Sequence, residues 1–316
     1  AAEMLKKQSQ YFEQLSIDEI KFNVANIYFS ILKQNKIIES LESGIKTLNE
    51  QKNRIDELVK LNKKTEIDSL KIDYRVSELK QELINALSKK DILYFNLNFL
   101  INKNNDNFKV KDCEICVDTN INLNFNEQIE IALKQRKDLI ASEVDLKIKQ
   151  TNIEIAKSRS KPTLNVFSNI DNKYALKDDI VQTNAYKNKI NWIAGINFEI
   201  PIWNGGRISE QIKQAELELE ISRAEFEKLK EKIIFELRSV LKNIESNRER
   251  IKTSLKNIEV SEFTLKIEKE KYELGKSSIT DVLIEETNYL KAKTQYYSML
   301  YDYAIALENL KFITGN

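Results

Sequence analysis

The chain has 316 residues, of which 41% are hydrophobic and 31% are charged, yet it contains only six glycines and two prolines. So few turn-forming residues predict long helices joined by few turns. The 50 basic and 49 acidic residues balance and are interspersed, which argues against nucleic acid as a partner. Histidine, the commonest general base and metal ligand, is absent, so the sequence favours neither an enzyme nor a cofactor-binding protein.

Residues 1–102 predict an antiparallel helical hairpin. Apolar residues follow a helical period from Ile17 to about Leu61, and Ile31, Ile38 and Ile45 lie seven positions apart. The pattern breaks after Leu61, and Thr65 with an acid three positions later is typical of the start of a second helix. This second helix is predicted to end near residue 101.

Residues 103–125 are polar, rich in asparagine and without periodicity, which indicates a linker. The linker contains Cys113 and Cys116. Such a pair can be a redox centre, half of a zinc site, or a structural or incidental thiol pair that forms a disulfide in an oxidising compartment. No second such pair and no histidine completes a tetrahedral zinc site, so no function is assigned to it.

Residues 126–316 form a second predicted unit, in which the residue pattern changes from helix to strand and back. A helix over 126–160, capped by Asn126, must end before Pro162. Strands follow over 163–171 and 190–203, because apolar and polar residues alternate there. The pair predicts a hairpin with a lipid-facing side and a wet side. The side chains expected to face lipid are Leu164, Val166, Trp192, Ile196, Phe198 and Ile200, and those expected to face water are Asn165, Asn191, Asn197 and Glu199.

A long helix over 207–273 follows the glycines that end the second strand. Its apolar residues fall at spacings of three, four and seven, which indicates a coiled-coil seam. A tip over 274–277 interrupts the pattern. A last helix over 278–313 then begins with Ser278 as cap and Asp281 three positions later.

The two helical hairpins are related by an internal repeat. A shift of 213 positions, which carries Ile31 onto Ile244, also aligns the two tips and the two caps. The aligned pairs include Phe22 with Phe235, Ile38 with Ile251, Asn62 with Gly275, Thr65 with Ser278 and Asp68 with Asp281. The first unit has no strands to match those of the second, so we interpret the sequence as a fragment whose first leading helix and first strand pair are missing.

Three segments carry a family resemblance: Pro162 with the strand after it, residues 195–207, and residues 272–283. Together they resemble the signature stretches of the TolC-like outer-membrane efflux proteins. The resemblance implies a mainly α fold in which long antiparallel coiled-coil helices of a homotrimer form an α-barrel tunnel in the periplasm. It also implies that each subunit contributes four strands to a shared transmembrane β-barrel of twelve strands. The implied location is the outer membrane of a double-membraned bacterium, with a large periplasmic portion.

The resemblance further implies an outer-membrane channel-tunnel of a tripartite efflux or type I secretion system, through which drugs, small molecules or proteins leave the cell. Its expected partners are a periplasmic adaptor and, through it, an inner-membrane pump. The implied docking tips are Leu274, Gly275 and Lys276, with Leu61, Asn62 and Lys63 in the first unit. The implied gate consists of Asp281, Asp68 and Tyr272, although Ile284 occupies the position of a second acid of the family's gate. For Asp281 and Asp68, a helix cap without a gating role is the alternative interpretation.

A structural or scaffolding coiled coil is the alternative function, and it accounts for the heptads equally well. It does not account for the strands. An isolated hairpin with one continuous apolar face would aggregate in water, whereas a closed barrel in lipid requires such a face.

Overall fold

The structure, a computed structural model, describes residues 2–102, 110–111, 124–173 and 189–315, with the backbone alone for 172–173 and 189–191. Cys113 and Cys116, most of the predicted linker and most of the loop between the strands lie outside the described residues. The chain divides into two compact units. The hairpin unit comprises Ala1–Ser9 and Ala141–Lys228, and the helical unit comprises Gln10–Ile140 and Leu229–Asn316.

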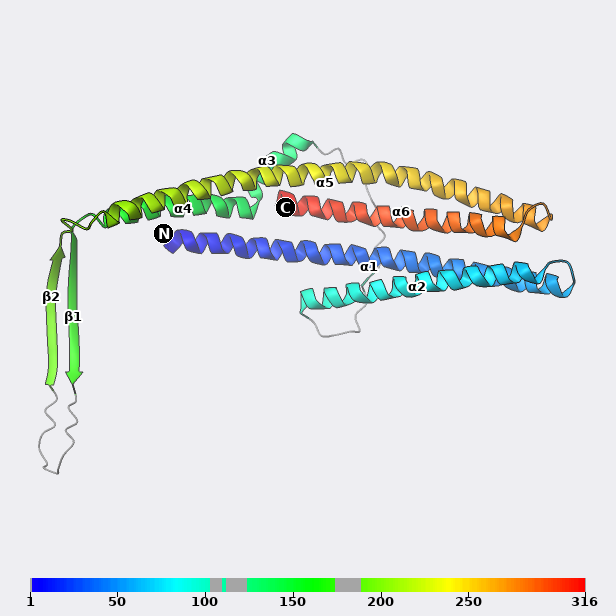
Figure 1. Ribbon diagram of the computed structural model, residues 1–316, viewed down its shortest axis with the longest axis horizontal. Helices are drawn as coiled ribbons and strands as arrows, with labels where there is room; N and C mark the ends of the chain where they lie inside the picture. Colours follow the sequence, from blue (N-terminus) through cyan, green and yellow to red (C-terminus); the bar gives the residue numbers. More distant parts are fainter. Residues whose placement is uncertain (1, 103–109, 112–123, 174–188, 316) are drawn as a thin grey trace, which may run out of the picture. The chain divides into compact units, whose positions relative to one another are not determined.

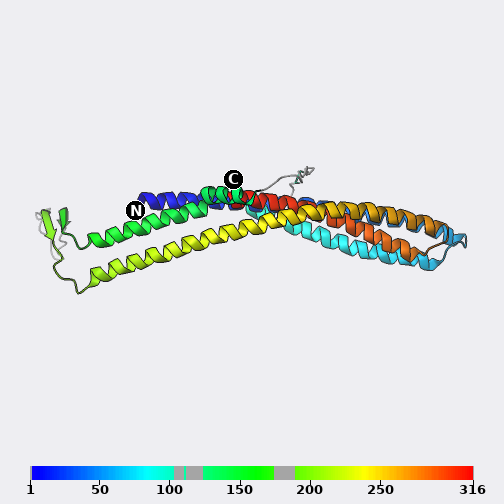
Figure 2. The same cartoon turned by 90° about the horizontal axis from the view of Figure 1, so that it is seen from above.

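The helical unit contains two antiparallel helix pairs. Helix α1 (Ala2–Lys60), which belongs to this unit from Gln10 onward, pairs with α2 (Glu66–Ile101), and α5 (Arg207–Glu273), from Leu229 onward, pairs with α6 (Ile279–Thr314) (Figures 1 and 2). The predicted bounds of α5 are confirmed. Helix α1 begins well before the predicted Ile17, because its first residues include no glycine or proline that would stop it.

The core of this unit follows the heptads. Leu41, Leu48 and Ile55, spaced by seven residues on α1, are buried against α2 and α6. Their cluster includes the fully buried Ile72 of α2 and Val282 of α6. A second cluster joins α5 to α6 through Leu237, Val240, Ile244, Ile251, Tyr303, Leu310 and Ile313. The helices are therefore held by apolar seams of the kind that the sequence predicts.

The backbone repeats the 213-residue shift of the sequence. The shift carries Lys60, Glu66 and Ile101, at helix ends of the first pair, onto Glu273, Ile279 and Thr314 at the same ends of the second. The left-handed residues also coincide: Asn62 (φ 56°) matches Gly275 (φ 71°), and Asn102 (φ 50°) matches Gly315 (φ 76°). The second helices of the two hairpins, α2 and α6, thus have 36 residues each and lie between matching turns.

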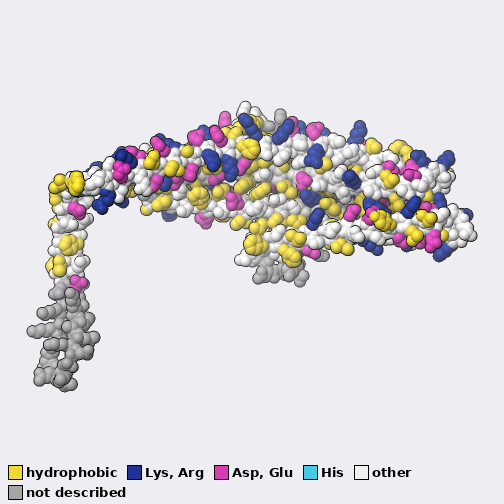
Figure 3. Space-filling model, viewed as in Figure 1, with side chains coloured by type: hydrophobic (Ala, Val, Ile, Leu, Met, Phe, Trp, Pro, Cys, Tyr) yellow, Lys and Arg dark blue, Asp and Glu magenta, His cyan; other side chains and the backbone are white. Residues whose placement is uncertain are grey.

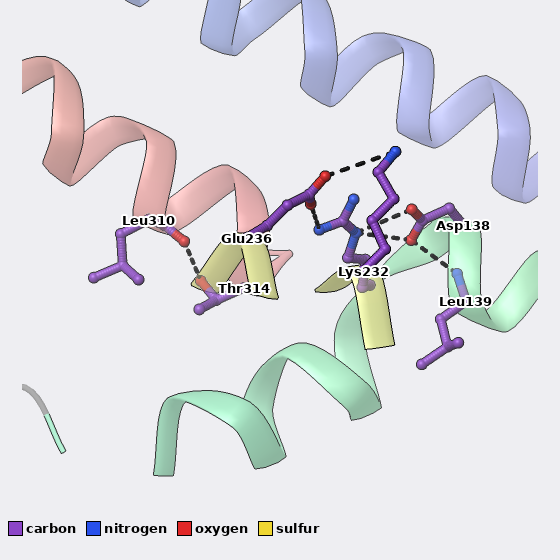
Figure 4. A network of polar contacts seen from close by, with 7 residues as sticks. Asp138, Leu139, Lys232, Glu236, Leu310 and Thr314 are labelled. Atoms are coloured by element: carbon purple, nitrogen blue, oxygen red, sulfur yellow. Dashed lines mark hydrogen bonds and ion pairs between the residues drawn. The ribbon is translucent and has the colours of Figure 1, made fainter. Parts of the chain in front are cut away.

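The predicted helix over 126–160 is wrong, since the structure contains two helices, α3 (Phe125–Gln135) and α4 (Lys137–Ser158). Arg136 between them is extended, with ψ 121°. Its guanidinium is buried and binds Asp138 at 2.9 Å and Glu236 of α5 at 2.8 Å. Both carboxylates are labelled in Figure 4. Two carboxylates from different elements therefore hold the chain out of the helical conformation here.

The end of α6 occupies the space beside this break. A Cβ on Gly315 would lie only 3.0 Å from the carbonyl carbon and oxygen of Gln135. The predicted cap of α3 is also wrong by two residues. The side chain of Asn124, rather than Asn126, accepts a hydrogen bond from the amide of Asn126. The local apolar pattern of residues 126–160 could not reveal that the end of α6 lies beside Gln135, where a continuous helix was predicted.

In the hairpin unit, α4 is joined to α5 by two antiparallel strands, β1 (Thr163–Lys173) and β2 (Lys189–Glu199). The prediction that the second strand continues to residue 203 is wrong, because Pro201 has no amide to donate and the pairing ends at Glu199. Ile200 therefore lies just beyond the strand. Asp145 of α4 accepts hydrogen bonds from Ser222 of α5 (2.6 Å) and Gln8 of α1 (3.1 Å), which ties the helices of this unit together.

Within the described residues, no helix has an apolar stretch of the length and hydropathy needed to cross a membrane.

Candidate functional site

The hairpin has one apolar and one mainly polar face. Leu164 pairs with Phe198 and Val166 with Ile196 along one face, on which Ile170 pairs with Trp192. All six side chains are exposed, and Val166 is 77% exposed. Apolar side chains are visible along the strands in Figure 3. Of the residues predicted to face lipid, five lie on this face of the strands, and Ile200 is exposed beyond it.

The opposite face brings Asn165 beside Asn197 and Thr163 beside Glu199, as the alternation predicts. The side chain of Asn191 lies outside the described side chains. Phe167 and Ile193 are apolar exceptions on this face, and the Phe167 ring lies over the backbone of Gly195, its cross-strand partner. A Cβ on Gly195 would lie 2.7 Å from Cζ of Phe167, so any other residue here would displace the ring.

The two helical tips have the same geometry. At the first tip, the amides of Asn62 and Lys63 donate to the carbonyls of Val59 and Leu58. At the second tip, the amides of Gly275 and Lys276 donate to the carbonyls of Tyr272 and Lys271. This arrangement is the Schellman motif, which requires the left-handed residue found at each tip. Leu61 and Leu274 are exposed at the corresponding positions of the two tips.

Asp281 forms the predicted capping box. Its amide donates to Ser278 Oγ at 3.3 Å, and its carboxylate accepts from the Ser278 amide at 3.0 Å. The hydrogen bonds from Ser278 hold the pKa of the Asp281 carboxyl below its usual value. The carboxylate is exposed and remains charged.

The prediction of an equal capping box at Thr65 is wrong. Thr65 occupies the cap position of α2, but its side chain makes no cap hydrogen bond, and the Asp68 amide donates to the Thr65 carbonyl instead (3.1 Å). The Asp68 carboxylate is thereby released from capping and faces the hydroxyl of Tyr272 on α5. Two of the three predicted gate residues therefore lie together.

Tyr272 is buried between the tips. Burial and, to a lesser extent, the Asp68 charge raise the pKa of its hydroxyl to about 12. This hydroxyl makes no hydrogen bond of standard length to the described residues. Lys64 of the first tip lies 3.7 Å above the centre of the ring and donates to the Tyr272 carbonyl at 3.4 Å. The ring thus joins the two helix pairs through a cation–π contact.

Sequence reasoning missed Lys64 and the buried Glu286. Glu286 lies one turn beyond Val282 in the apolar register of α6, and this acid at a core position was the available signal. Burial raises the pKa of its carboxyl, while Lys269 of α5 and Arg75 of α2 act in the opposite direction. Among the described residues, no group of three or more His, Cys, Asp or Glu side chains could hold a metal ion.

Paired long helices with an exposed two-stranded hairpin define a class of fold found in outer-membrane channels. The chain resembles the crystal structure of the Campylobacter jejuni CmeC outer membrane channel with a TM-score of 0.79 at 19% identity, covering 99% of this chain and 66% of that one. It resembles the outer membrane protein VceC of Vibrio cholerae with a TM-score of 0.79 at 15% identity, covering 98% and 73% respectively. These likenesses establish the fold.

The Outer membrane efflux protein family matches residues 128–316, and the chain belongs to this family. The outer membrane protein TolC of Salmonella enteritidis is 25% identical over 200 residues, which are 60% of this chain and 39% of that protein. The chain spans about two fifths of the length of the curated relatives that it matches. Family membership assigns the chain to the outer membrane, and the family is one of efflux proteins rather than of enzymes.

Proposed function

We propose that this chain belongs to a passive exit duct, the outer-membrane channel-tunnel of a tripartite efflux or type I secretion system. The observation that carries the proposal is the two-faced hairpin, whose apolar face is exposed along both strands. In water this face is an aggregation hazard, whereas in a barrel wall it is the surface that lipid requires. A scaffolding coiled coil has no use for such a surface.

In the proposed assembly three copies close a ring, and each contributes four strands to a twelve-stranded barrel. The face with Leu164, Val166 and Ile196 contacts lipid, and the face with Asn165 and Asn197 lines the lumen. The helices form the wall of a periplasmic tunnel. The duct itself needs no catalytic group or cofactor, because transport is driven by an inner-membrane pump.

The exposed tips at Leu61–Lys63 and Leu274–Lys276 are the proposed docking sites of the periplasmic adaptor. Equal geometry at both tips supports this role, since a ring of copies would present them at alternating positions around one rim. Replacing Gly275 with tryptophan should abolish export while the trimer persists in the outer membrane. Loss of the trimer would instead identify a folding role for this glycine.

The proposed gate lies close to these tips. In it, Asp68 faces the Tyr272 hydroxyl, and Asp281 supplies an exposed carboxylate on α6. In a trimer, up to three Asp281 carboxylates would gather at the tunnel entrance and favour cations. Opening would then separate Asp68 from Tyr272 as the helix pairs part.

Single-channel recording in planar bilayers tests both the duct and its gate. The full-length protein should form ion-conducting pores, and Asp281→Asn should weaken their cation selectivity and their block by trivalent cations. Ser278→Ala is the matched control, because it removes the cap and keeps the charge. A protein that forms no pores would contradict the duct. Equal selectivity in Asp281→Asn and the parent would leave Asp281 only the role of a cap.

A further inference from the structure

The segment between β2 and α5 has no role in the proposed duct. Ile202 and Trp203 in this segment are 94% and 89% exposed, the largest exposed fractions among the large apolar side chains that the structure describes. They follow Phe198, which pairs with Leu164 where the apolar face of the hairpin meets the helices (Figure 3). Tryptophan prefers the boundary between hydrocarbon and water, because its ring is apolar and its N–H donates hydrogen bonds. For a hairpin in lipid, Trp203 therefore marks the level at which the chain leaves the hydrocarbon.

Three basic residues adjoin the two ends of the hairpin: Arg159 and Lys161 after the end of α4, and Arg207 at the first position of α5. All three are exposed, and we call them the basic cluster. Arg159 donates to Oε1 of Gln211 at 2.8 Å, which places it beside the first turns of α5 and gives it a neutral partner. None of the three forms an ion pair with an acid among the described residues, and the sequence has no acid between positions 155 and 170. The basic cluster therefore lacks a counter-ion within the described part of the chain.

The helix ends do not account for the basic cluster. Basic side chains often bind the last carbonyls of a helix, but at the end of α4 other groups already bind them. The hydroxyls of Ser158 and Ser160 donate to the carbonyls of Ile155 and Lys157, both at 2.7 Å. The backbone amides of residues 159–161 donate to the carbonyls of residues 156–158. Arg207 lies at a helix N-terminus, where the helix dipole disfavours a cation. An anion from outside the chain would stabilise all three charges.

We propose that the basic cluster binds the phosphate groups of anionic phospholipids in the membrane leaflet that faces the periplasm. The proposal rests on the proposed function, because the hairpin must lie in a bilayer with the helices on its periplasmic side. At about 3.3 Å per residue, Lys161 lies about 10 Å from Leu164 along the chain. The headgroup layer of a bilayer is about 5–8 Å thick on each side. Long basic side chains extend toward headgroups from such positions, which brings the cluster within reach of this layer.

The charge of the basic cluster favours anionic lipids. Each basic side chain near an anionic lipid surface strengthens binding roughly fivefold, so three together should give a preference of at least about tenfold. The nearest acid of the strands, Glu199, pairs with Thr163 on the opposite, mainly polar face of the hairpin. In the first turn of α5, Glu210 is bound by Lys213 at 2.9 Å. Neither acid therefore neutralises the cluster.

Native mass spectrometry of the full-length protein, freed of lipid in detergent, tests the proposal with two probes, phosphatidylglycerol and phosphatidylcholine. We expect phosphatidylglycerol to bind at least about tenfold more tightly, because phosphatidylcholine carries a compensating positive charge. The combination of Arg159→Gln, Lys161→Gln and Arg207→Gln should remove this preference. The combination of Arg159→Lys, Lys161→Arg and Arg207→Lys keeps the charges and should keep the preference, which separates a loss of charge from a loss of fold.

A matched control neutralises three other basic residues of α5 through Lys228→Gln, Lys256→Gln and Lys266→Gln. These side chains are exposed and lie at least about 30 Å beyond Arg207 along the helix. The control has the same net charge as the neutralised cluster and should keep the lipid preference. Equal losses in the two variants, or equal binding of the two lipids by the parent, would overturn the proposal. Full displacement of the lipid by excess inorganic phosphate would overturn it in favour of a site for free anions.

Quenching of tryptophan fluorescence by phospholipids brominated at defined depths measures the level of Trp203 in vesicles of phosphatidylglycerol and phosphatidylcholine. The signal that Trp203→Phe removes should be quenched best by bromines nearest the headgroup. The signal that Trp192→Phe removes should be quenched best by deeper bromines, because Trp192 lies about 20 Å from Phe198 along β2. An unquenched Trp192 would refute the duct and with it the headgroup site. Quenching of both tryptophans without a lipid preference would refute the headgroup site alone.

Discussion

Gly275 and Asn62 show how one residue decides the course of a turn. Both adopt a left-handed conformation in the same hydrogen-bonded motif, but only glycine does so without strain. No other atom lies within 4 Å of a Cβ placed on Gly275, so the backbone conformation is the whole cost of a side chain there. Gly275 at the second tip is thus the residue best suited to this turn, and Asn62 at the first tip is the next best suited.

We therefore expect Gly275→Ala to lower the free energy of unfolding by about 1 kcal/mol, the cost of a left-handed residue with a Cβ. Asn62→Gly should be neutral or slightly stabilising. Chemical denaturation followed by circular dichroism measures both. A neutral Gly275→Ala would mean that the tip relaxes into another turn.

Glu286 predicts a pH dependence of stability. Burial raises its pKa in the folded state above the ordinary value of 4.5, so the folded protein binds this proton more tightly than the unfolded chain does. The contribution of Glu286 to the free energy of unfolding should therefore be least unfavourable below pH 4.5. It should become more unfavourable as the pH rises through the pKa that Glu286 has in the folded state. Glu286→Gln should raise the melting temperature at neutral pH and remove this dependence.

Arg75 and Lys269 face the same carboxylate from α2 and α5. If they formed a compensating ion pair with Glu286, Glu286→Gln would lower the melting temperature at neutral pH. Thermal melts from pH 4 to 8, with Glu285→Gln at the neighbouring, partly exposed acid as the control, distinguish the two outcomes.

At the scale of an element, the strand hairpin was predictable because two-residue alternation is local. The predicted end of the second strand was wrong because the alternation continues past Pro201, whereas the hydrogen bonds between the strands cannot continue there. The α3–α4 break was not predictable, since apolar periodicity continues across Arg136 and Glu236, one of the two acids that bind its guanidinium, comes from the distant α5.

The apolar face of the hairpin predicts an asymmetric response to charge. Ile196→Arg should cost about 2–4 kcal/mol near the middle of a bilayer, whereas Asn197→Arg, on the opposite face one residue away, should be tolerated. The yield of assembled, protease-resistant protein in membranes measures the difference. Equal yields would show that this face does not contact lipid.

The joint between α3 and α4 depends on a buried cation. Arg136→Met would leave Asp138 without its ion-pair partner and Glu236 with Lys232 alone, and breaking a buried pair costs about 3–5 kcal/mol. Because the Glu236 side chain is partly exposed, we expect the loss in the free energy of unfolding to lie at the lower end of this range. Adding Glu236→Gln should restore part of the stability in urea unfolding, and an unchanged midpoint in the single variant would refute the role of the joint.

At the scale of the molecule, the contacts between the two helix pairs require both tips to lie at one level. Lys64 reaches Tyr272, and Lys71 reaches Thr280, only because the two hairpins end together. Removing one heptad from each helix of both pairs (residues 42–48, 76–82, 255–261 and 289–295) should preserve the seams and the tip contacts.

Removing 255–261 and 289–295 alone should shift one tip by about 10 Å and separate these contacts. The shortened single pair should therefore melt at a lower temperature than the chain shortened in both pairs. The opposite order would show that the tips do not need to be level.

The sequence by itself determined what depends on neighbouring residues: the four long helices, the two-faced hairpin, the left-handed turn at Gly275 and the capping box of Asp281. Each follows from a period, a missing Cβ or a hydroxyl at a fixed spacing. The resemblance of three segments then led to the family that residues 128–316 confirm.

Only the tertiary structure decided which polar groups meet across elements. It placed Asp68 beside Tyr272, interrupted the helix at Arg136, and left Phe99 and Phe235 exposed while their counterparts in the repeat, Phe312 and Phe22, stack. The physical reason is that burial and charge compensation depend on which surfaces are brought together, and residues as far apart as Arg136 and Glu236 come together only in the folded chain.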